Sequence, residues 1–281
     1  MSEEKTQTEK LNDYLQTYLK STDNNDELEI RFGTNYKNKI TRIKFDNIIK
    51  KLKSLGFSMI DSSGKYHLNI QPEYNDLNTG KIKLSNIRTE IKGFSNIQNY
   101  CNKNSFNLET PEDHISFIRK KFKVNNNNKL FPLDLNKFEC RLNYKVEEKL
   151  SPDVPMVRRT LDTWKDNKKS FRMIKRFTFV KKGFPFKFDL SILKTSKYNV
   201  KLKRYITEYN VTNADLFNNL ESYEVELELL NVSAKRLEFK ELMNKLKRGI
   251  MIILSALQNT NYPIPYTECE KVLLEYTIIA N

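Results

Sequence analysis

The run SYEVELELL, residues 222–230, places a glutamate at every second position and fills most positions between them with apolar residues. In a β-strand, residues two apart point to the same face at a spacing of about 7 Å. One face would carry Glu224, Glu226 and Glu228, and the other would be apolar. Three like charges in a row disfavour one another unless positive charge lies in front of them. A helix would instead scatter the glutamates around its surface, and the residues alone permit both readings.

A second run, DELEIRFG at residues 26–33, has the same alternation, with Glu27, Glu29 and Arg31 on one face and apolar residues on the other. Between the two acidic runs, further alternating runs carry mainly basic groups on their polar faces. These faces comprise Arg88, Glu90 and Lys92; Glu139, Arg141, Asn143, Lys145 and Glu147; Arg172 and Arg176; and Lys187, Asp189 and Ser191. A strand face that lies in water tolerates Ser, Thr, Asn and Gln freely, whereas these faces hold charged residues in near-unbroken rows.

Apolar residues at helical spacing predict helices at residues 11–20, 45–55, 237–257 and 267–276, and each needs an apolar surface to cover. Strands flanked by helices indicate an α+β, β-rich fold in a single domain over residues 1–281, with a helix in 1–22 as an N-terminal appendage. If the sheet closes into an antiparallel β-barrel of about eight strands, its charged faces line a tunnel. The helices then cover the apolar outside of the barrel.

Charge and composition narrow the partners and the compartment. Lys and Arg number 49 against 35 Asp and Glu, a formal net charge of +14, which indicates an anionic partner such as nucleic acid, nucleotide or polyphosphate. Three cysteines far apart, with no CxxC pair, argue against a disulfide framework or a structural zinc site. They favour a reducing, cytoplasmic compartment. Neither a secretion signal nor an apolar run long enough to span a bilayer is evident, so no membrane association is expected.

A charged tunnel is costly unless opposite charges neutralise one another or a ligand completes it. Carboxylates at one end of this set of strands and cations at the other are suited to bind a polyphosphate that carries a metal ion. Glutamate oxygens hold a hard Mg²⁺ or Mn²⁺, while arginine and lysine bind phosphate oxygens. The pattern therefore favours a metal-assisted phosphate chemistry.

The paired ELEIRF and YEVELEL strands, with basic strands between them, resemble the triphosphate tunnel metalloenzymes. The likeness is closest to the RNA 5′-triphosphatase domains of mRNA capping enzymes from fungi and large DNA viruses. Features typical of the giant-virus branch are the ELEIRFG opening, the strand ending KVEE, the spacing of Arg172 to Arg176, the K-x-D-x-S run at 187–191 and YEVELELLN before a long helix. The resemblance covers roughly residues 27–276. A viral origin would place the protein in the host cytoplasm or the virion.

The resemblance implies an activity and a role for individual positions. The activity is metal-dependent hydrolysis of the γ-phosphate of 5′-triphosphate RNA, the first step of mRNA cap formation, together with NTP hydrolysis, and Mg²⁺ or Mn²⁺ is the cofactor. The expected metal-binding glutamates are Glu27, Glu29, Glu224, Glu226 and Glu228, with Glu228 as a direct ligand. The expected triphosphate contacts are Arg172, Arg176 and Lys187, with Arg88, Arg141 and Lys145 as further phosphate contacts.

Two acidic residues receive supporting roles from the same resemblance. Asp189 would orient the cations or a metal-bound water, and Glu147 would position the attacking water. The sequence departs from the family at Ile174, where relatives often carry a third cation. Either the phosphate grip is weaker there, or Lys175 compensates through a bulge in the strand.

Alternatives remain open for both activity and partners. A tunnel phosphatase acting on tripolyphosphate or another small triphosphate is one, although such enzymes tend to be shorter. A non-catalytic RNA-binding capping subunit is the other, against which the intact glutamate rows speak. Capping enzymes often continue into a guanylyltransferase domain with a K-x-D-G motif, which this sequence lacks. A standalone triphosphatase and the N-terminal part of a longer capping enzyme are both possible. A guanylyltransferase or methyltransferase domain could lie in the same or another chain.

Overall fold

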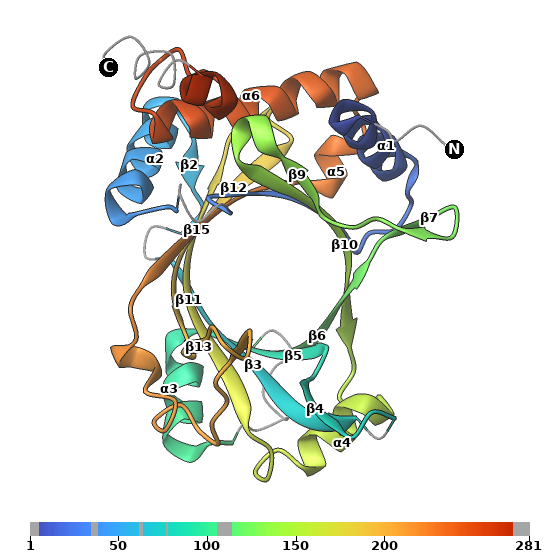
Figure 1. Cartoon of the computed structure of the whole chain (residues 1–281), viewed down its shortest axis with the longest axis vertical. Helices are drawn as coiled ribbons and strands as arrows, with labels where there is room; N and C mark the ends of the chain where they lie inside the picture. The colour runs from blue at the N-terminus through green and yellow to red at the C-terminus, as the bar shows by residue number, and fades with distance from the viewer. Residues whose placement is uncertain (1–5, 35–38, 62–63, 77, 106–113, 272–281) are drawn as a thin grey trace.

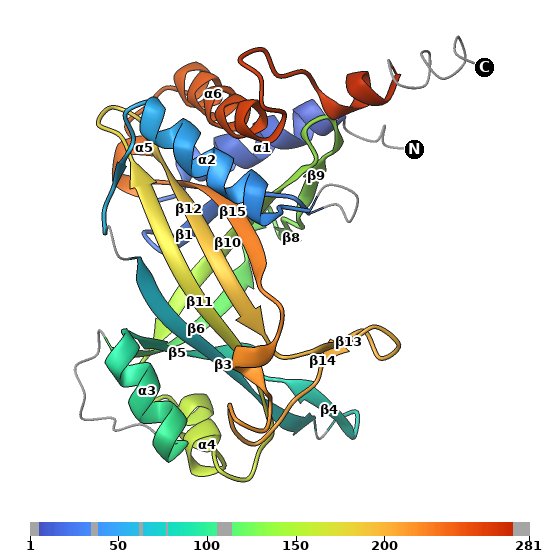
Figure 2. The same cartoon turned by 90° about the vertical axis from the view of Figure 1, so that its left-hand side faces the viewer.

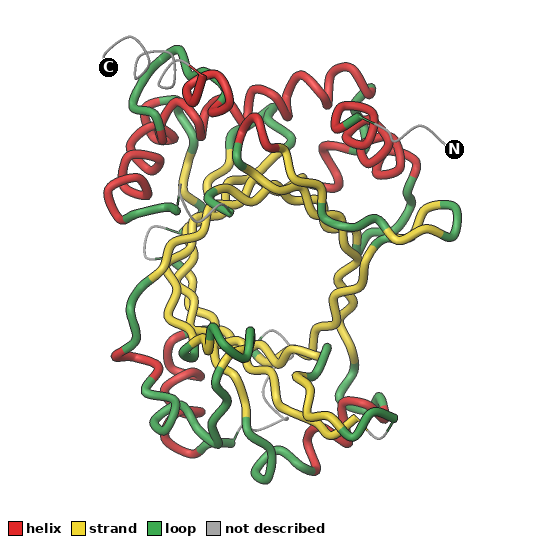
Figure 3. The backbone as a smooth tube through the Cα atoms, viewed as in Figure 1, coloured by secondary structure: helices red, strands yellow, loops and turns green. Residues whose placement is uncertain are grey.

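In the computed structural model, residues 6–34, 39–61, 64–76, 78–105 and 114–271 are described. Eight antiparallel strands form a closed barrel, seen end-on in Figures 1 and 3, and we call the interior of this barrel the tunnel. In order around the barrel they are β11 (Lys169–Val180), β12 (Phe186–Thr195), β15 (Ser222–Leu229), β1 (Asp26–Phe32), β10 (Cys140–Leu150), β6 (Ile115–Phe122), β5 (Ile87–Lys92) and β3 (Lys65–Asp76). Pairing of β11 with β3 closes the ring. The predicted β-rich α+β barrel is confirmed.

Shorter elements extend or decorate this barrel. The short strands are β2 (Ser58–Met59), β4 (Lys81–Leu84), β7 (Val124–Asn125), β8 (Asn128–Lys129), β9 (Leu133–Leu135), β13 (Tyr198–Asn199) and β14 (Arg204–Tyr205). Of these, β2, β4 and β9 join the main sheet, while β7–β8 and β13–β14 form separate two-stranded hairpins. Among the residues that the structure describes, 3₁₀ turns lie at η2 (Asn136–Phe138) and η3 (Leu216–Asn218).

Helices cover the barrel from outside on two opposite sides (Figures 1 and 2). One side carries α1 (Gln7–Lys20), α2 (Arg42–Ser54), α5 (Asn231–Ala234) and α6 (Phe239–Leu257), and the other carries α3 (Phe94–Lys103) and α4 (Pro155–Asp162). The sequence did not predict α3 and α4, which are short and bury few residues. Residues 266–271 are helical, and the remainder of the helix expected at 267–276 lies outside the described residues. No helix in the described part of the chain is long and apolar enough to cross a membrane.

Local capping explains why α1 begins earlier than its apolar pattern. The Thr6 side chain accepts a hydrogen bond from the backbone N–H of Glu9, and the Glu9 carboxylate accepts one from the Thr6 N–H at 2.8 Å. This reciprocal pair satisfies two N–H groups that the first turn leaves without helical partners. The helix therefore starts at Gln7, four residues before the first apolar position that sequence periodicity detects.

The core lies between the barrel's outer face and the helices. Val225, Leu227 and Leu229 are buried there together with apolar residues of α2 and α6. Gly249 of α6 lets the helix approach β15 closely, since a Cβ at that position would lie 2.6 Å from a methyl group of Leu227. Tyr223 packs its ring 5.2 Å from that of Phe45. The expectation that the Tyr223–Leu229 positions lie beneath helices is confirmed.

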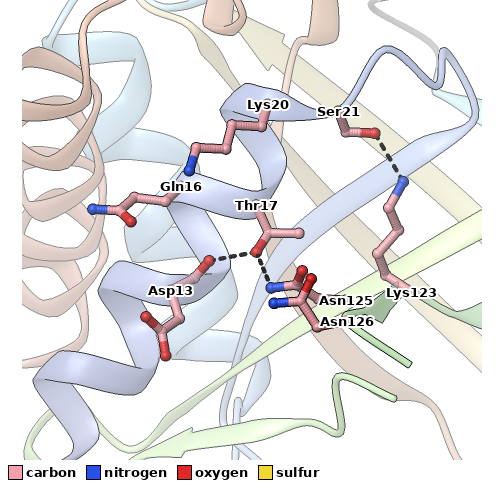
Figure 4. Close-up of a pocket in the computed structure, with 8 residues that line it drawn as sticks. All are labelled: Asp13, Gln16, Thr17, Lys20, Ser21, Lys123, Asn125 and Asn126. Atoms are coloured by element: carbon pink, nitrogen blue, oxygen red, sulfur yellow. Dashed lines mark hydrogen bonds between the residues drawn. The ribbon is translucent and has the colours of Figure 1, made fainter. Parts of the chain in front are cut away.

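A polar contact outside the barrel holds α1 and the β7–β8 hairpin together. Asn125 donates a hydrogen bond to the Thr17 hydroxyl at 2.8 Å, and the Lys123 ammonium donates to Ser21 at 2.8 Å, both along one cavity (Figure 4). The same ammonium lies 2.7 Å from the buried carboxylate of Asp26. Asp26 opens β1, so this contact fixes the start of the strand that carries Glu27.

Candidate active site in the barrel tunnel

Strand register brings the charged positions of three neighbouring strands into rows on the inner face. The alternation predicted from sequence is therefore a real strand alternation, with SYEVELEL as β15. Across β1, β15 and β12, the rows are Glu29–Glu228–Lys187 and Arg31–Glu226–Asp189, and Glu224 lies opposite Ser191. Each of the first two rows thus holds two adjacent carboxylates and one cation on one wall of the tunnel.

Glu226 lies at the centre of this wall and is already neutralised. Its side chain is only 5% exposed, and it forms ion pairs with Arg31 and, at 3.6 Å, with Arg176. Burial acts to raise the pKa of Glu226, but Arg31, Arg176 and Arg172 outweigh it and lower the pKa. Glu224 is paired with Arg172 in the same way. These two glutamates therefore hold the guanidinium groups in place.

Glu29 and Glu228, in contrast, have raised pKa values. Burial and the neighbouring carboxylate of Glu226 raise the pKa of Glu29 to about 7, although Asn143 donates to it at 3.0 Å. Burial also raises the pKa of Glu228 to about 7, aided by Asp189 and Glu27, despite Lys187 at 3.1 Å. These two carboxylates lack enough positive charge around them, which is the condition under which a buried acid gains from an added cation.

The donor chemistry of these carboxylates fits a divalent cation. Glu27, Glu29 and Glu228 offer hard oxygen donors, and each of the last two has a pKa that shows unmet negative charge. Within the described residues, no three His, Cys, Asp or Glu side chains form a ready metal-ligand cluster. Instead, the Lys120 ammonium lies 2.6 Å from Glu27, and Arg31 and Lys187 contact the other two. The metal-ligand roles of the five glutamates remain predictions.

Two of the three predicted phosphate-binding cations lie beside Asp189 on the tunnel wall, and the third, Arg172, contacts Glu224. Arg172 and Arg176 are on β11 and Lys187 is on β12. Asp189 is 1% exposed and lies 3.1 Å from the Lys187 ammonium and 3.7 Å from the Arg176 guanidinium. Thr178 also donates a hydrogen bond to it. This geometry is compatible with the predicted orienting role of Asp189.

The other predicted phosphate contacts are less uniform in position. Arg88 lies 3.8 Å from Glu147, and the Lys120 ammonium lies 3.0 Å from the same carboxylate. Lys145 pairs in register with Glu27, and burial lowers its pKa. Arg141, in contrast, is 44% exposed and forms a two-point ion pair with Asp134 of β9, at 2.6 and 3.1 Å. It lies at the rim of the site rather than inside it.

The tunnel also contains Arg31, Glu90 and Lys120, none of which was among the predicted site residues. Lys120 contacts both Glu27 and Glu147, but its strand reads as three consecutive cations, so alternation does not reveal which one points inward. The register of β6 against β10, which pairs Lys120 with Glu147, decides it. Glu90 was visible on an alternating face between Arg88 and Lys92, but nothing in its own strand showed that His67 of β3 also lies beside it.

At Ile174 the structure decides between the two alternatives. The pairing of β11 with β12 and with β3 is continuous, so the strand has no bulge there. Ile174 is 3% exposed and has the same parity as Arg172 and Arg176. The Lys175 ammonium lies 5.2 Å from the centroid of the Tyr66 ring and 5.4 Å from that of Phe177, on the outer face. Compensation by Lys175 is therefore wrong.

No protein-family model matches this chain, and no curated protein matches its sequence. Among solved structures, the mimivirus capping enzyme triphosphatase is similar, with a TM-score of 0.52 and 17% identity, over 87% of this chain and 95% of that chain. The RNA triphosphatase of S. pombe gives a TM-score of 0.48 and 12% identity, over 90% and 94%. The likeness to the viral enzyme confirms, at the level of the fold, the resemblance seen in the sequence.

Proposed function

We propose that this protein is a metal-dependent hydrolase that removes the γ-phosphate from 5′-triphosphate RNA, and also from NTPs. The observation that carries the proposal is a pair of buried carboxylates, Glu29 and Glu228, whose pKa values are raised to about 7 in a tunnel whose walls also carry arginine and lysine side chains. Such a site lacks positive charge at these two glutamates and presents arginine and lysine side chains that can bind an anion. A polyphosphate with a divalent cation meets both needs.

The chain's own residues would bind and orient the substrate. Arg172, Arg176 and Lys187 offer charge-assisted hydrogen bonds to phosphate oxygens and hold the triphosphate along the tunnel axis. Asp189 keeps two of these cations in place. Glu147, held by Lys120 and Arg88, would orient the attacking water. Phosphoryl transfer depends mostly on such positioning and on electrostatics, so no nucleophilic side chain is needed.

Glu27, Glu29 and Glu228 would hold the metal ion, with Glu224 and Glu226 supporting through the arginines that they pair with. The ion would be Mg²⁺ or Mn²⁺, and when bound it supplies Lewis-acid stabilisation of charge on the γ-phosphate oxygens. Because lysine and arginine side chains contact these carboxylates, metal binding would require them to turn toward the phosphates. In cap formation the diphosphate-ended RNA would then pass to a guanylyltransferase in the same or another chain.

Phosphate release from 5′-triphosphate RNA, ATP and tripolyphosphate tests the proposal, with Mg²⁺ or Mn²⁺ and with EDTA. Release from RNA and ATP should require the metal and should be lost in a Glu27→Ala/Glu228→Ala double variant. Glu148→Ala is the matched control, because Glu148 lies on the same strand as Glu147 but pairs outside with Arg119 and Lys121. It should retain activity.

Four outcomes would contradict the proposal. Metal-independent release, or full activity in the double variant, would exclude the tunnel mechanism. Cleavage of tripolyphosphate alone would identify a phosphatase for small substrates. RNA binding with no release from any of the three substrates would identify a non-catalytic capping subunit.

A further inference from the structure

A basic and aromatic hairpin lies at one mouth of the tunnel. We call residues 197–206, which contain β13 and β14, the mouth hairpin. It follows β12 directly, and the last residue of that strand, Thr195, pairs in register with Arg172. Figure 2 shows the hairpin projecting past the end of β12, and Figure 1 shows it at the lower rim of the tunnel. The inner-face cation of β11 nearest to this hairpin along the sheet is therefore Arg172, a proposed phosphate-binding residue.

The mouth hairpin carries four cations and no acidic residue: Lys197, Lys201, Lys203 and Arg204. All four are exposed, and only Lys197 has an acidic neighbour close by in the described part of the chain, Asp215 at 3.8 Å. Tyr198 and Tyr205 are 52% and 39% exposed, with ring centroids 5.3 Å apart in an edge-to-face arrangement. Exposed rings interleaved with uncompensated cations are typical of surfaces that bind single-stranded nucleic acid.

Backbone and side-chain contacts fix the base of this hairpin. The N–H of Ile206 donates to the carbonyl of Lys197 at 2.7 Å. Lys169 and Glu208 exchange backbone hydrogen bonds at 2.8 and 2.9 Å. The Thr207 hydroxyl donates to the Glu73 carboxylate of β3 at 2.7 Å. A surface held in this way loses little freedom on binding, because the hairpin is already ordered relative to the barrel.

The tunnel has a direction relative to the hairpin. β15 runs from Ser222, opposite Leu193, to Leu229, opposite Phe186. The pair of Arg172 with Glu224 therefore lies toward the hairpin, and the pair of Lys187 with Glu228 lies toward the far end. A triphosphate that enters from the hairpin side meets Arg172 first and brings its terminal phosphate toward Glu228. The nucleotides that follow it would remain outside, beside the hairpin.

We infer that the mouth hairpin binds the first nucleotides of a single-stranded 5′-triphosphate RNA while the triphosphate occupies the tunnel. Bases stack on Tyr198 and Tyr205, and backbone phosphates contact Lys201, Lys203 and Arg204. The inference rests on the proposed function and deepens it. It assigns the preference for RNA over free nucleotides and tripolyphosphate to a surface separate from the hydrolytic site.

The test compares kcat/KM for a short 5′-triphosphate RNA, ATP and tripolyphosphate in the full chain. A Tyr198→Ala/Tyr205→Ala variant should lose about tenfold or more on the RNA, because each stacked base contributes about that factor. Its activity on tripolyphosphate should stay within about twofold of wild type, since that substrate has no base to stack. A Tyr198→Phe/Tyr205→Phe variant keeps both rings and should retain the RNA activity.

A second variant tests the charges. Lys201→Gln/Lys203→Gln/Arg204→Gln should weaken RNA binding and reduce the slope of log K against log salt by up to about 2, at about 0.7 for each lost phosphate contact. The control is Lys50→Gln/Lys53→Gln/Arg248→Gln, which removes the same three charges from exposed positions on α2 and α6. The control should change the salt slope little.

Unchanged RNA activity and an unchanged salt slope in the hairpin variants would overturn the inference while leaving the proposed hydrolysis intact. Equal losses on RNA and tripolyphosphate would also overturn it, because the hairpin would then act through the fold of the barrel. If wild-type protein released phosphate from no substrate, the proposed function itself would fail. Fluorescence anisotropy of the same RNA, in EDTA, would still decide whether the hairpin binds it.

Discussion

Two buried glutamates on different walls of one tunnel, Glu228 and Glu90, differ in their charge environment. Their side chains are 19% and 13% exposed, so both are largely removed from water. Burial raises the pKa of both, and for Glu228 the result is about 7 because Asp189 and Glu27 add to it. For Glu90, His67, Arg88 and Lys92 at 3.4–3.8 Å reverse the effect, and its pKa falls to about 2. One wall is short of positive charge, and the other is already neutral.

The same two walls differ in what supports them from outside. β1, β12 and β15 lie against the largest apolar cluster, which includes residues of α1, α2 and α6. β3 and β5 contribute to two smaller clusters beneath α3 and α4. The wall that carries the crowded carboxylates therefore packs against the larger apolar cluster. Crowded like charges are tolerated only where packing holds the strands that carry them, because burying uncompensated charge opposes folding.

The largest expected effect is the loss of activity from Glu228→Gln. This change keeps the size of the side chain but removes the charge that a divalent cation needs. We expect kcat to fall by about a hundredfold or more in metal-dependent phosphate release. Glu90→Gln should cost far less activity, since its charge is already satisfied by its neighbours, and should lower stability instead. Equal losses in the two variants would remove the distinction between the walls.

The pH dependence of stability, measured without metal, tests the raised pKa of Glu228. In the folded protein this pKa is about 7, above its ordinary value of 4.5, so between these values the unfolded chain ionises first. Stability should therefore be fully present below pH 4.5 and fall as pH rises through 7, by up to ~3 kcal/mol for this group.

Denaturant unfolding in EDTA at pH 5 and pH 8 measures this loss. Glu228→Gln should remove the part of this stability loss that is due to Glu228. The stability of the variant relative to the wild type should therefore increase with pH. Added Mg²⁺ should stabilise the wild type more at pH 8 than at pH 5, because protons compete with the ion. If the stability of the variant fell as steeply between pH 5 and pH 8 as that of the wild type, the raised pKa would not belong to Glu228.

Gly249→Val tests the support behind the acidic wall. A side chain at this position meets the Leu227 methyl groups, and Leu227 lies between Glu226 and Glu228 in β15. We expect a loss of about 1–3 kcal/mol in the free energy of unfolding, with reduced activity, because either α6 or β15 must move. Met251→Val is the control, since Met251 is 37% exposed on the same helix. Its effect should stay below about 1 kcal/mol.

The smallest expected effect is a gain. Ile174→Lys would place a third cation between Arg172 and Arg176 on the inner face of β11. We expect KM for the triphosphate substrate to fall by about two- to fivefold, the size of one partly screened charge interaction. Lys175→Gln, on the outer face, should leave KM unchanged. A higher KM in Ile174→Lys would show that this position needs an apolar side chain.

Much of this tunnel could be predicted from local sequence. The alternation in 26–33 and 222–230 identifies the two acidic strands, and their apolar faces predict the helices that cover them. The predicted contact of Lys175 was wrong because it required a bulge, and a single strand does not reveal whether its partners pair continuously. Lys120 was missed for a related reason, since three adjacent cations have no distinguishable parity until a neighbouring strand sets it.

The sequence by itself determined which side chains share a face, because strand geometry assigns alternate residues to opposite sides whatever the fold. It also determined that the polar faces of these strands carry more charged residues than a solvent-exposed strand face requires. Only the tertiary structure decided which charges meet. Pairing of β3 with β5 placed His67 beside Glu90, and pairing of β15 with β1 and β12 left Glu29 and Glu228 crowded by other carboxylates. Electrostatic energy depends on distances across strands far apart in the chain, and no local pattern contains those distances.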